Sequence, residues 1–182
     1  MTVAATTRPP ARTGSWRLAG RTRKAVLVTH IMAAGVWIGL DVAMAVLVFT
    51  ALGTQDRGTE AFALQALQLV TVWPMLAAGL LSLVTGIVLG LGGRYGLVRY
   101  WWVAIKLALN IVLCVLIAFA LRGGVEEAAE AGRDMAAGAD AVWNSRDLVF
   151  PPIVSSVALV LAFVLSVFKP WGRVRRAATR PQ

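Results

Sequence analysis

Four long apolar stretches alternate with shorter polar segments along the chain. They cover residues 25–52, 62–91, 100–121 and 148–168. A bilayer core about 30 Å thick is crossed by roughly 20 apolar residues in a helix, and each of the four stretches reaches that length. The pattern therefore predicts an all-α integral membrane protein in which four transmembrane helices form an antiparallel bundle.

The segments outside these spans are predicted to be polar tails and loops. Residues 1–24 and 169–182 form basic tails, and the first of them has no apolar period, which favours disorder. Residues 122–147 form the longest connection, an outer loop in which Val125–Ala137 is expected to make a helical turn or two. Three acids in this loop are expected to repel one another rather than form ion pairs four residues apart. They are Glu126, Glu127 and Glu130.

Small residues and prolines predict how the helices pack. Close helix packing in lipid uses small side chains, and stripes of them favour either the inside of the bundle or the interface of a homodimer. These stripes are Gly79, Ser82, Gly86 and Gly90 on the second span, and Ser155, Leu159, Ala162 and Ser166 on the fourth. Pro74 is expected to kink the second helix. Pro151 and Pro152 fit the first turn of the fourth helix, where their missing N–H groups cost little.

The charged residues decide the predicted orientation. Thirteen of the 18 Lys and Arg residues lie, without any acid, in the two tails and in the connection between the second and third spans. By the positive-inside rule, both termini then lie in the cytoplasm. The net charge of +9 on a chain that is 58% hydrophobic therefore reports orientation. Because the bases are split between two tails without interleaved aromatic residues, no nucleic-acid partner is predicted.

The cysteine and histidine counts limit the metal chemistry. The single cysteine excludes an internal disulfide and a Cys-cluster metal site. The single histidine, His30, excludes a site with two His ligands from one chain. His30 is therefore the candidate metal ligand that the sequence offers.

Three ionisable residues lie inside the predicted spans: His30, Asp41 and Lys106. A charge at the bilayer centre costs about 2.5–3.5 kcal/mol unless it is paired or hydrated. At 1.5 Å per residue, His30 lies roughly 8 Å and Lys106 roughly 9 Å inside the cytoplasmic ends of their helices. The two residues therefore share a layer, which meets the second helix near Thr85–Gly86. This layer is the predicted ligand site.

Helical spacing places two further residues on the helix faces that carry His30 and Lys106. Trp37 lies on the His30 face of the first span, and Asn110 lies on the Lys106 face of the third. The titratable and polar groups of the spans lie at staggered depths, as a proton path requires. They are Asp41, Asn110, Lys106 and His30. The alternative is structural, with His30 bonded to a carbonyl and Lys106 snorkelling to the inner surface.

Asp41 stands apart from the layer. It lies about eleven residues, or roughly 16 Å, beyond His30 towards the outer side. Its expected partners are Gln68 or Thr71 of the second span, or Arg146 at the outer end of the fourth.

Two segments resemble a bacterial family of integral membrane proteins called domain of unknown function 2269. The first is THIMAAGVWIGLDVA and the second is WPMLAAGLLSLVTGIVLGLGGRYGLVRYWWVAIKLALN. The resemblance covers about residues 26–120, with a weaker fourth span, and implies a place in the bacterial cytoplasmic membrane. That family is distantly similar to HemJ-type protoporphyrinogen oxidases, which bind haem b, and to CopD-type copper-resistance membrane proteins.

The resemblance implies particular roles for residues of this chain. His30 matches the candidate haem ligand and Lys106 the functionally important lysine, while Trp37 and Gly39 match the remainder of the first-helix motif. The chain departs from the pattern because it has no second His for a bis-His haem and no Met-rich cluster for copper. A five-coordinate haem b, a haem shared by a dimer and a chain without haem are the alternatives.

Three functions are compatible with these observations. The first is a haem- or tetrapyrrole-associated redox protein with His30 as axial ligand and Lys106 beside a propionate. The second is a small transporter or proton-handling protein that uses Asp41 and Asn110 as well. The third is a membrane scaffold or accessory subunit with a homodimeric or membrane-protein partner. No catalytic residue is predicted, and whether the chain is an enzyme stays open.

Overall fold

The structure, a computed structural model, describes residues 19–92, 100–143 and 146–168. The regular elements of these residues are helical, and all but two short ones are α-helices. They are α1 (Gly20–Gly53), α2 (Arg57–Val70), α3 (Val72–Leu91), α4 (Trp101–Leu116), the π-helical η1 (Ile117–Leu121), α5 (Arg122–Ala136), the 3-10 turn η2 (Asp147–Val149) and α6 (Phe150–Phe168).

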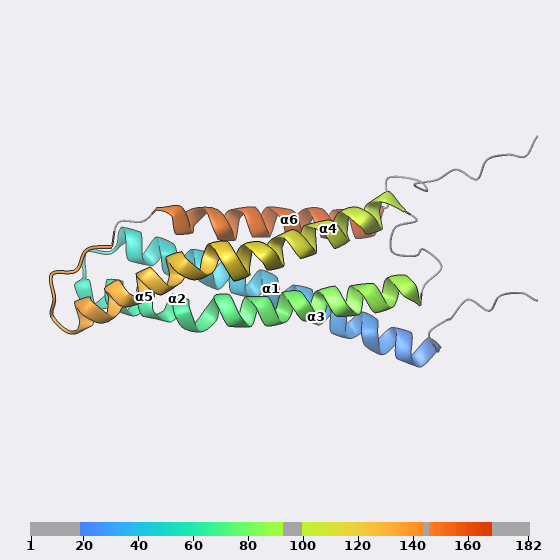
Figure 1. The fold of residues 1–182 in the computed structure, drawn as a ribbon, viewed down its shortest axis with the longest axis horizontal. Helices are drawn as coiled ribbons and strands as arrows, with labels where there is room; N and C mark the ends of the chain where they lie inside the picture. The colour runs from blue at the N-terminus through green and yellow to red at the C-terminus, as the bar shows by residue number, and fades with distance from the viewer. Residues whose placement is uncertain (1–18, 93–99, 144–145, 169–182) are drawn as a thin grey trace, which may run out of the picture.

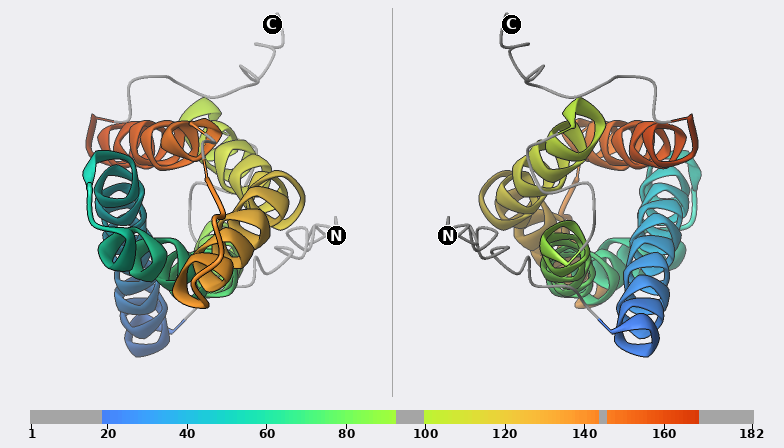
Figure 2. Two further views of the ribbon diagram at one scale, coloured as in Figure 1. Left: turned by 90° about the vertical axis from the view of Figure 1, so that its left-hand side faces the viewer. Right: turned by 90° about the vertical axis from the view of Figure 1, so that its right-hand side faces the viewer.

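These elements build four long rods that run back and forth along one axis (Figure 1). The rods are α1, α2 with α3, α4 with η1 and α5, and η2 with α6. All four are long and apolar enough to cross a membrane. Seen along the axis, the rods lie around the centre of an elongated bundle (Figure 2). The predicted all-helical fold with four apolar spans is therefore confirmed at this level.

The second rod breaks where the sequence predicts a kink. The backbone of Thr71 leaves the helical region, with φ −96° and ψ −93°, between the end of α2 and the start of α3. Pro74 has no N–H to donate to a carbonyl one turn earlier. The helical backbone hydrogen bonds resume at Met75, whose N–H donates to the Thr71 carbonyl at 2.9 Å. The Thr71 hydroxyl donates back to the Leu67 carbonyl of α2 at 2.5 Å.

The third rod is longer than predicted. Residues 122–136 of the expected outer loop form α5, which continues the helix beyond residue 121. The expectation that the acids of this segment make no ion pair is wrong for Glu126, whose Oε1 lies 2.7 Å from Nε of Arg122 four residues earlier. Both side chains are exposed, so this pair contributes little to stability. What holds α5 in place is its contact with α2.

Gly132 allows α5 to lie close against α2. A Cβ at this position would come within 2.8 Å of the Ala61 carbonyl oxygen and 2.9 Å of Leu64 Cβ. Nε2 of Gln65 joins the two backbones, donating to the Gly132 carbonyl at 3.0 Å and to the Ala61 carbonyl at 3.2 Å. Together α2 and α5 cover one end of the bundle, which we call the outer end (Figure 1).

The tightest packing is also at the outer end. Apolar side chains with no exposed surface gather there from α1, α2 and α5; they are Met44, Val48, Leu64, Leu67, Val125, Ala128 and Ala129. The hydrophobic effect drives such burial in water, whereas it does not act between helices in lipid. Towards the opposite, inner end, buried side chains are sparse among the described residues. They are Ala33, Ser82, Thr85, Trp102 and Leu165.

The fourth helix begins as predicted. Pro151 and Pro152 lie in the first turn of α6, directly after its first residue. The outward faces of the rods carry large exposed apolar side chains such as Val36, Phe119 and Val160. Such faces suit contact with lipid chains, because single soluble domains rarely expose contiguous apolar surface on this scale.

Candidate functional site

His30 lies on α1 and contacts α3. Its Nδ1 is 3.0 Å from the Ser82 carbonyl oxygen and 3.0 Å from the Thr85 hydroxyl oxygen, and the ring is half-buried. A Cβ on Gly86 would come within 3.3 Å of the ring carbon Cε1. The imidazole therefore meets α3 at Thr85–Gly86, which is the level that the residue count predicts.

These hydrogen bonds determine which ring nitrogen carries the proton. A carbonyl oxygen only accepts, so Nδ1 must donate to Ser82. The Thr85 hydroxyl donates to the Leu81 carbonyl at 2.6 Å, so towards Nδ1 it serves as an acceptor as well. In neutral imidazole, a protonated Nδ1 leaves a lone pair on Nε2. His30 thus presents Nε2 as an acceptor or metal ligand.

Lys106 lies on α4 and contacts α6. Its Nζ donates to the Ser166 hydroxyl at 2.8 Å, and that hydroxyl donates to the Ala162 carbonyl at 2.9 Å. The ammonium also lies 4.9 Å from the ring centroid of Trp102, one turn earlier on the same helix, where the negative face of the indole attracts a cation. Lys106 is therefore held within the bundle by a hydroxyl and an aromatic ring.

The two residues of the His30–Lys106 layer belong to different helix pairs, α1 with α3 and α4 with α6. His30 bonds to α3 and Lys106 bonds to α6, so these hydrogen bonds do not link the two side chains to each other. Both residues lie in the inner half, where few side chains are buried among the described residues.

The partner of Asp41 differs from each of the expected ones. Asp41 is fully buried, and its Oδ2 accepts a hydrogen bond of 2.8 Å from the Ser155 hydroxyl on α6. The residues expected to pair with it are engaged elsewhere or exposed: Gln68 accepts from Arg133, Thr71 donates to the Leu67 carbonyl, and Arg146 is exposed.

Ser155 was missed as a partner although the sequence carries its signal. It begins the small-residue stripe of the fourth span, and Ser166, which accepts from Lys106, ends that stripe. A count along single helices gives depth but not the rotation of one helix against its neighbour. For that reason the count could not select Ser155 over the polar residues of the second span.

The two remaining candidates lie outside the contacts of His30. Trp37 is fully buried, and its indole packs so closely on α3 that a Cβ on Gly79 would lie 2.8 Å from the ring. Asn110 accepts a 3.5 Å contact from the Cys114 thiol of its own helix. Neither contact extends from the His30–Lys106 layer towards Asp41. The roles of Trp37 towards a cofactor and of Asn110 in a polar path stay predictions.

The donor atoms of the site restrict the kind of metal it suits. Bare metal ions such as Zn²⁺ require three or four protein ligands. In the part of the chain that the structure describes, no three His, Cys, Asp or Glu side chains gather closely enough to hold one. A metal that brings its own macrocycle of four nitrogens needs only an axial ligand, and His30 Nε2 fits that requirement.

No protein-family model, curated protein or solved structure matches this chain. The resemblance to the domain of unknown function 2269 family therefore stays a prediction from the motifs quoted above.

Proposed function

We propose that this chain is a membrane-embedded tetrapyrrole-binding protein that holds haem b through Nε2 of His30. The observation that carries the proposal is the hydrogen bond from Nδ1 to the Ser82 carbonyl. Metal-ligating histidines commonly donate their second ring N–H to a carbonyl or carboxylate, which fixes the tautomer and the ring orientation. His30 has this arrangement, although it is the sole histidine of the chain.

Lys106 is the proposed partner of a haem propionate. Its ammonium is already stabilised by the Ser166 hydroxyl and the Trp102 ring. A propionate would add a negative charge beside this ammonium. Fewer side chains are buried in the inner half than at the outer end among the described residues, so a planar ligand would displace fewer core contacts there.

Bound haem would supply one-electron redox chemistry, with a potential set by its axial ligand and its surroundings. The contribution of the chain is to orient the imidazole, to pair a carboxylate with Lys106 and to surround the group with apolar helices. A continuous proton path is less well supported, because the hydrogen bonds of His30, Lys106 and Asp41 lead to three separate contacts.

We further propose that the four rods span the bacterial cytoplasmic membrane with both termini in the cytoplasm. Three bases, Arg21, Arg23 and Lys24, begin α1 at the inner end. Both α2 and α5 carry acids at the outer end. This charge difference supports the orientation through the positive-inside rule.

The haem proposal is tested by absorption spectroscopy of the detergent-purified chain after addition of haem b. We expect a saturable Soret band whose position shifts on reduction. His30→Ala should abolish the saturable band because the axial nitrogen is lost. Lys106→Ala should keep the band and weaken haem binding about tenfold, the usual scale for one charge-assisted hydrogen bond.

The matched control is Thr29→Ala, which removes an exposed polar side chain next to His30 on α1. The Thr29 hydroxyl bonds only to the Ala25 carbonyl of its own helix, so this variant should bind haem like the parent chain. An unaltered Soret band in a folded His30→Ala variant, or no saturable band in the parent chain, would overturn the proposal.

A further inference from the structure

A second polar feature lies away from the His30–Lys106 layer, in a groove between α1 and α6. The groove has a volume of about 710 Å³ and is lined mainly by apolar side chains. Val42, Val46 and Phe49 form the α1 wall, and Ile153 and Val157 form the α6 wall. Each of these side chains is about half exposed or more, so the groove opens sideways towards the lipid.

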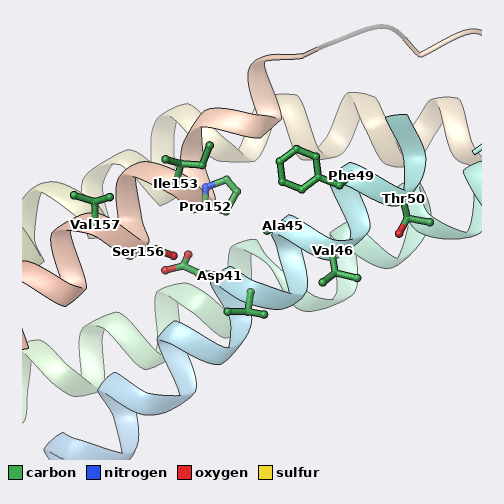
Figure 3. Close-up of a pocket in the computed structure, with 10 residues that line it drawn as sticks. Asp41, Ala45, Val46, Phe49, Thr50, Pro152, Ile153, Ser156 and Val157 are labelled. Carbon is green, nitrogen blue, oxygen red and sulfur yellow. The ribbon is translucent and has the colours of Figure 1, made fainter. Parts of the chain in front are cut away.

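Asp41 is the acidic residue at this groove. Its carboxyl group points towards α6, between the two helices, as Figure 3 shows. Oδ2 accepts from Ser155, whereas Oδ1 is buried and has no hydrogen-bond partner. Leaving a buried oxygen without a partner costs about 1–3 kcal/mol, and more when the group is charged. Oδ1 therefore marks a position where a hydrogen-bond donor would be stabilised.

Nothing in the described chain neutralises a charge on Asp41. The two ion pairs among residues 19–92, 100–143 and 146–168 join Arg57 to Asp140 and Arg122 to Glu126, at the outer end. A buried carboxylate in an apolar wall is stabilised by a cation that carries its own N–H donors. The complementary ligand is therefore positively charged where it meets Asp41 and apolar along the rest of its length.

The position of the groove indicates that such a ligand enters from the bilayer. Asp41 has no exposed surface of its own and lies beside walls that face lipid. Ser155 lies about eight residues, or roughly 12 Å, along the helix from Asp147, the acid at the outer end. A phospholipid head group would have to bury its phosphate to reach this depth, whereas the single ammonium of a long-chain amine would not.

We propose that the α1–α6 groove binds membrane-dissolved amphipathic amines, with the Asp41 carboxylate as counter-ion to the ammonium and the valine-rich walls around the apolar body. Ser155 holds the carboxylate in place through Oδ2, and the ammonium donates to Oδ1. Phe49 lies further along the groove beside Pro152 (Figure 3), where it contacts the apolar part of the ligand. This site is independent of haem binding, because it shares no residue with the His30–Lys106 layer.

The test uses rhodamine 6G, a fluorescent hydrophobic cation with N–H donors, and the full chain in detergent. Fluorescence anisotropy should show saturable binding that dodecylamine displaces and dodecanol, its uncharged analogue, does not. Asp41→Asn preserves the shape of the side chain and its contact with Ser155 but removes the charge, and it should weaken binding about tenfold or more. Val46→Trp should weaken binding by filling the groove.

The control for a bulky substitution is Val36→Trp. Val36 is 51% exposed and Val46 is 58% exposed on the same helix, but Val36 does not line the groove. This variant should bind rhodamine 6G like the parent chain. Equal displacement by dodecanol, or unchanged binding in both Asp41→Asn and Val46→Trp, would overturn the proposal. A parent chain that binds haem but not rhodamine 6G would overturn the amine site alone.

Discussion

Gly79 marks a close approach between α3 and its neighbours. A Cβ there would lie 2.8 Å from the ring of Trp37 and 2.9 Å from Sγ of Cys114. The glycine thus accommodates an indole from α1 and a thiol from α4 at one point of α3. His30 and Asp41 also join α1 to other helices, but through hydrogen bonds: His30 bonds to Ser82 on α3, and Asp41 bonds to Ser155 on α6. Single residues, through size or one hydrogen bond, therefore determine which helices are neighbours.

Gly79→Ala should destabilise the bundle, because Trp37 and Cys114 must both move to admit a methyl group. Overpacking of this kind costs about 1–3 kcal/mol. The measurement is reversible unfolding of the detergent-solubilised protein, followed by circular dichroism.

The matched control is Gly35→Ala on α1. A Cβ on Gly35 would meet nothing within 4 Å, so alanine there should be neutral or stabilising by up to about 1 kcal/mol through helix propensity. If Gly79→Ala were as stable as Gly35→Ala, the close contact at Trp37 would not exist in the folded protein.

At the scale of elements, α2 has a hydrogen-bonded cap at its start and a break before a proline at its end. It begins after Asp56, whose Oδ2 accepts from both the backbone N–H and the hydroxyl of Thr59 at 2.7 Å. It ends at Val70, and Thr71, three residues before Pro74, follows as the C-cap. Between these ends, α2 buries its apolar side against α1 and α5, with Leu64 and Leu67 fully buried. The cap and the contact with α5 together position the outer end.

The cap at Asp56 predicts a pH dependence of stability. The hydroxyl and backbone hydrogen bonds from Thr59 hold the pKa of Asp56 below its ordinary value of 3.8. A lowered pKa in the folded state means that the carboxylate adds stability at neutral pH and that this stability is lost as the pH falls through the lowered pKa. Asp56→Ala should therefore reduce the midpoint of thermal unfolding at pH 7.

The difference between Asp56→Ala and the parent chain should shrink progressively as the pH is lowered past 3.8. Glu127→Ala, which removes an exposed acid from α5, serves as the control. It should leave the midpoint of thermal unfolding nearly unchanged both at pH 7 and below pH 3.8. A pH-independent loss in Asp56→Ala would show that the carboxylate does not act as the cap.

At the scale of the whole molecule, the rods combine an apolar layer with an outer end at which α2 and α5 carry charged residues. About 20 residues, with Lys106 as the one charge, separate Trp101 from Arg122, and about 20 uncharged residues separate Asp147 from Phe168. This length matches a bilayer core of roughly 30 Å. The first rod has 34 residues, or roughly 51 Å, and therefore extends beyond that layer. Its outer part packs against α2.

The proposed orientation predicts which ends an impermeant thiol reagent reaches in intact cells. In a Cys114→Ala background, Ala139→Cys at the outer end should be labelled from outside the cell. Thr22→Cys, at the start of α1, should be labelled only after the membrane is permeabilised. Both positions are exposed, so burial does not explain a difference between them. The reverse labelling pattern would contradict the orientation.

The sequence by itself determined the number of apolar spans, the break near Pro74 and the level at which His30 meets Thr85–Gly86. These follow from the chain alone, because span length, proline geometry and the rise per residue act along a single helix. It did not determine that residues 122–136 continue the third rod. That outcome depends on the close approach that Gly132 permits against α2, a contact between segments far apart in the chain.

Only the tertiary structure decided the partners of the polar residues. Ser155 for Asp41 and Ser166 for Lys106 follow from the rotation of α6 relative to α1 and α4, and no pattern within one helix encodes that rotation. The groove beside Asp41 has the same origin. Depth in the membrane is a property of one helix, whereas a hydrogen bond or a groove between helices depends on the packing of two.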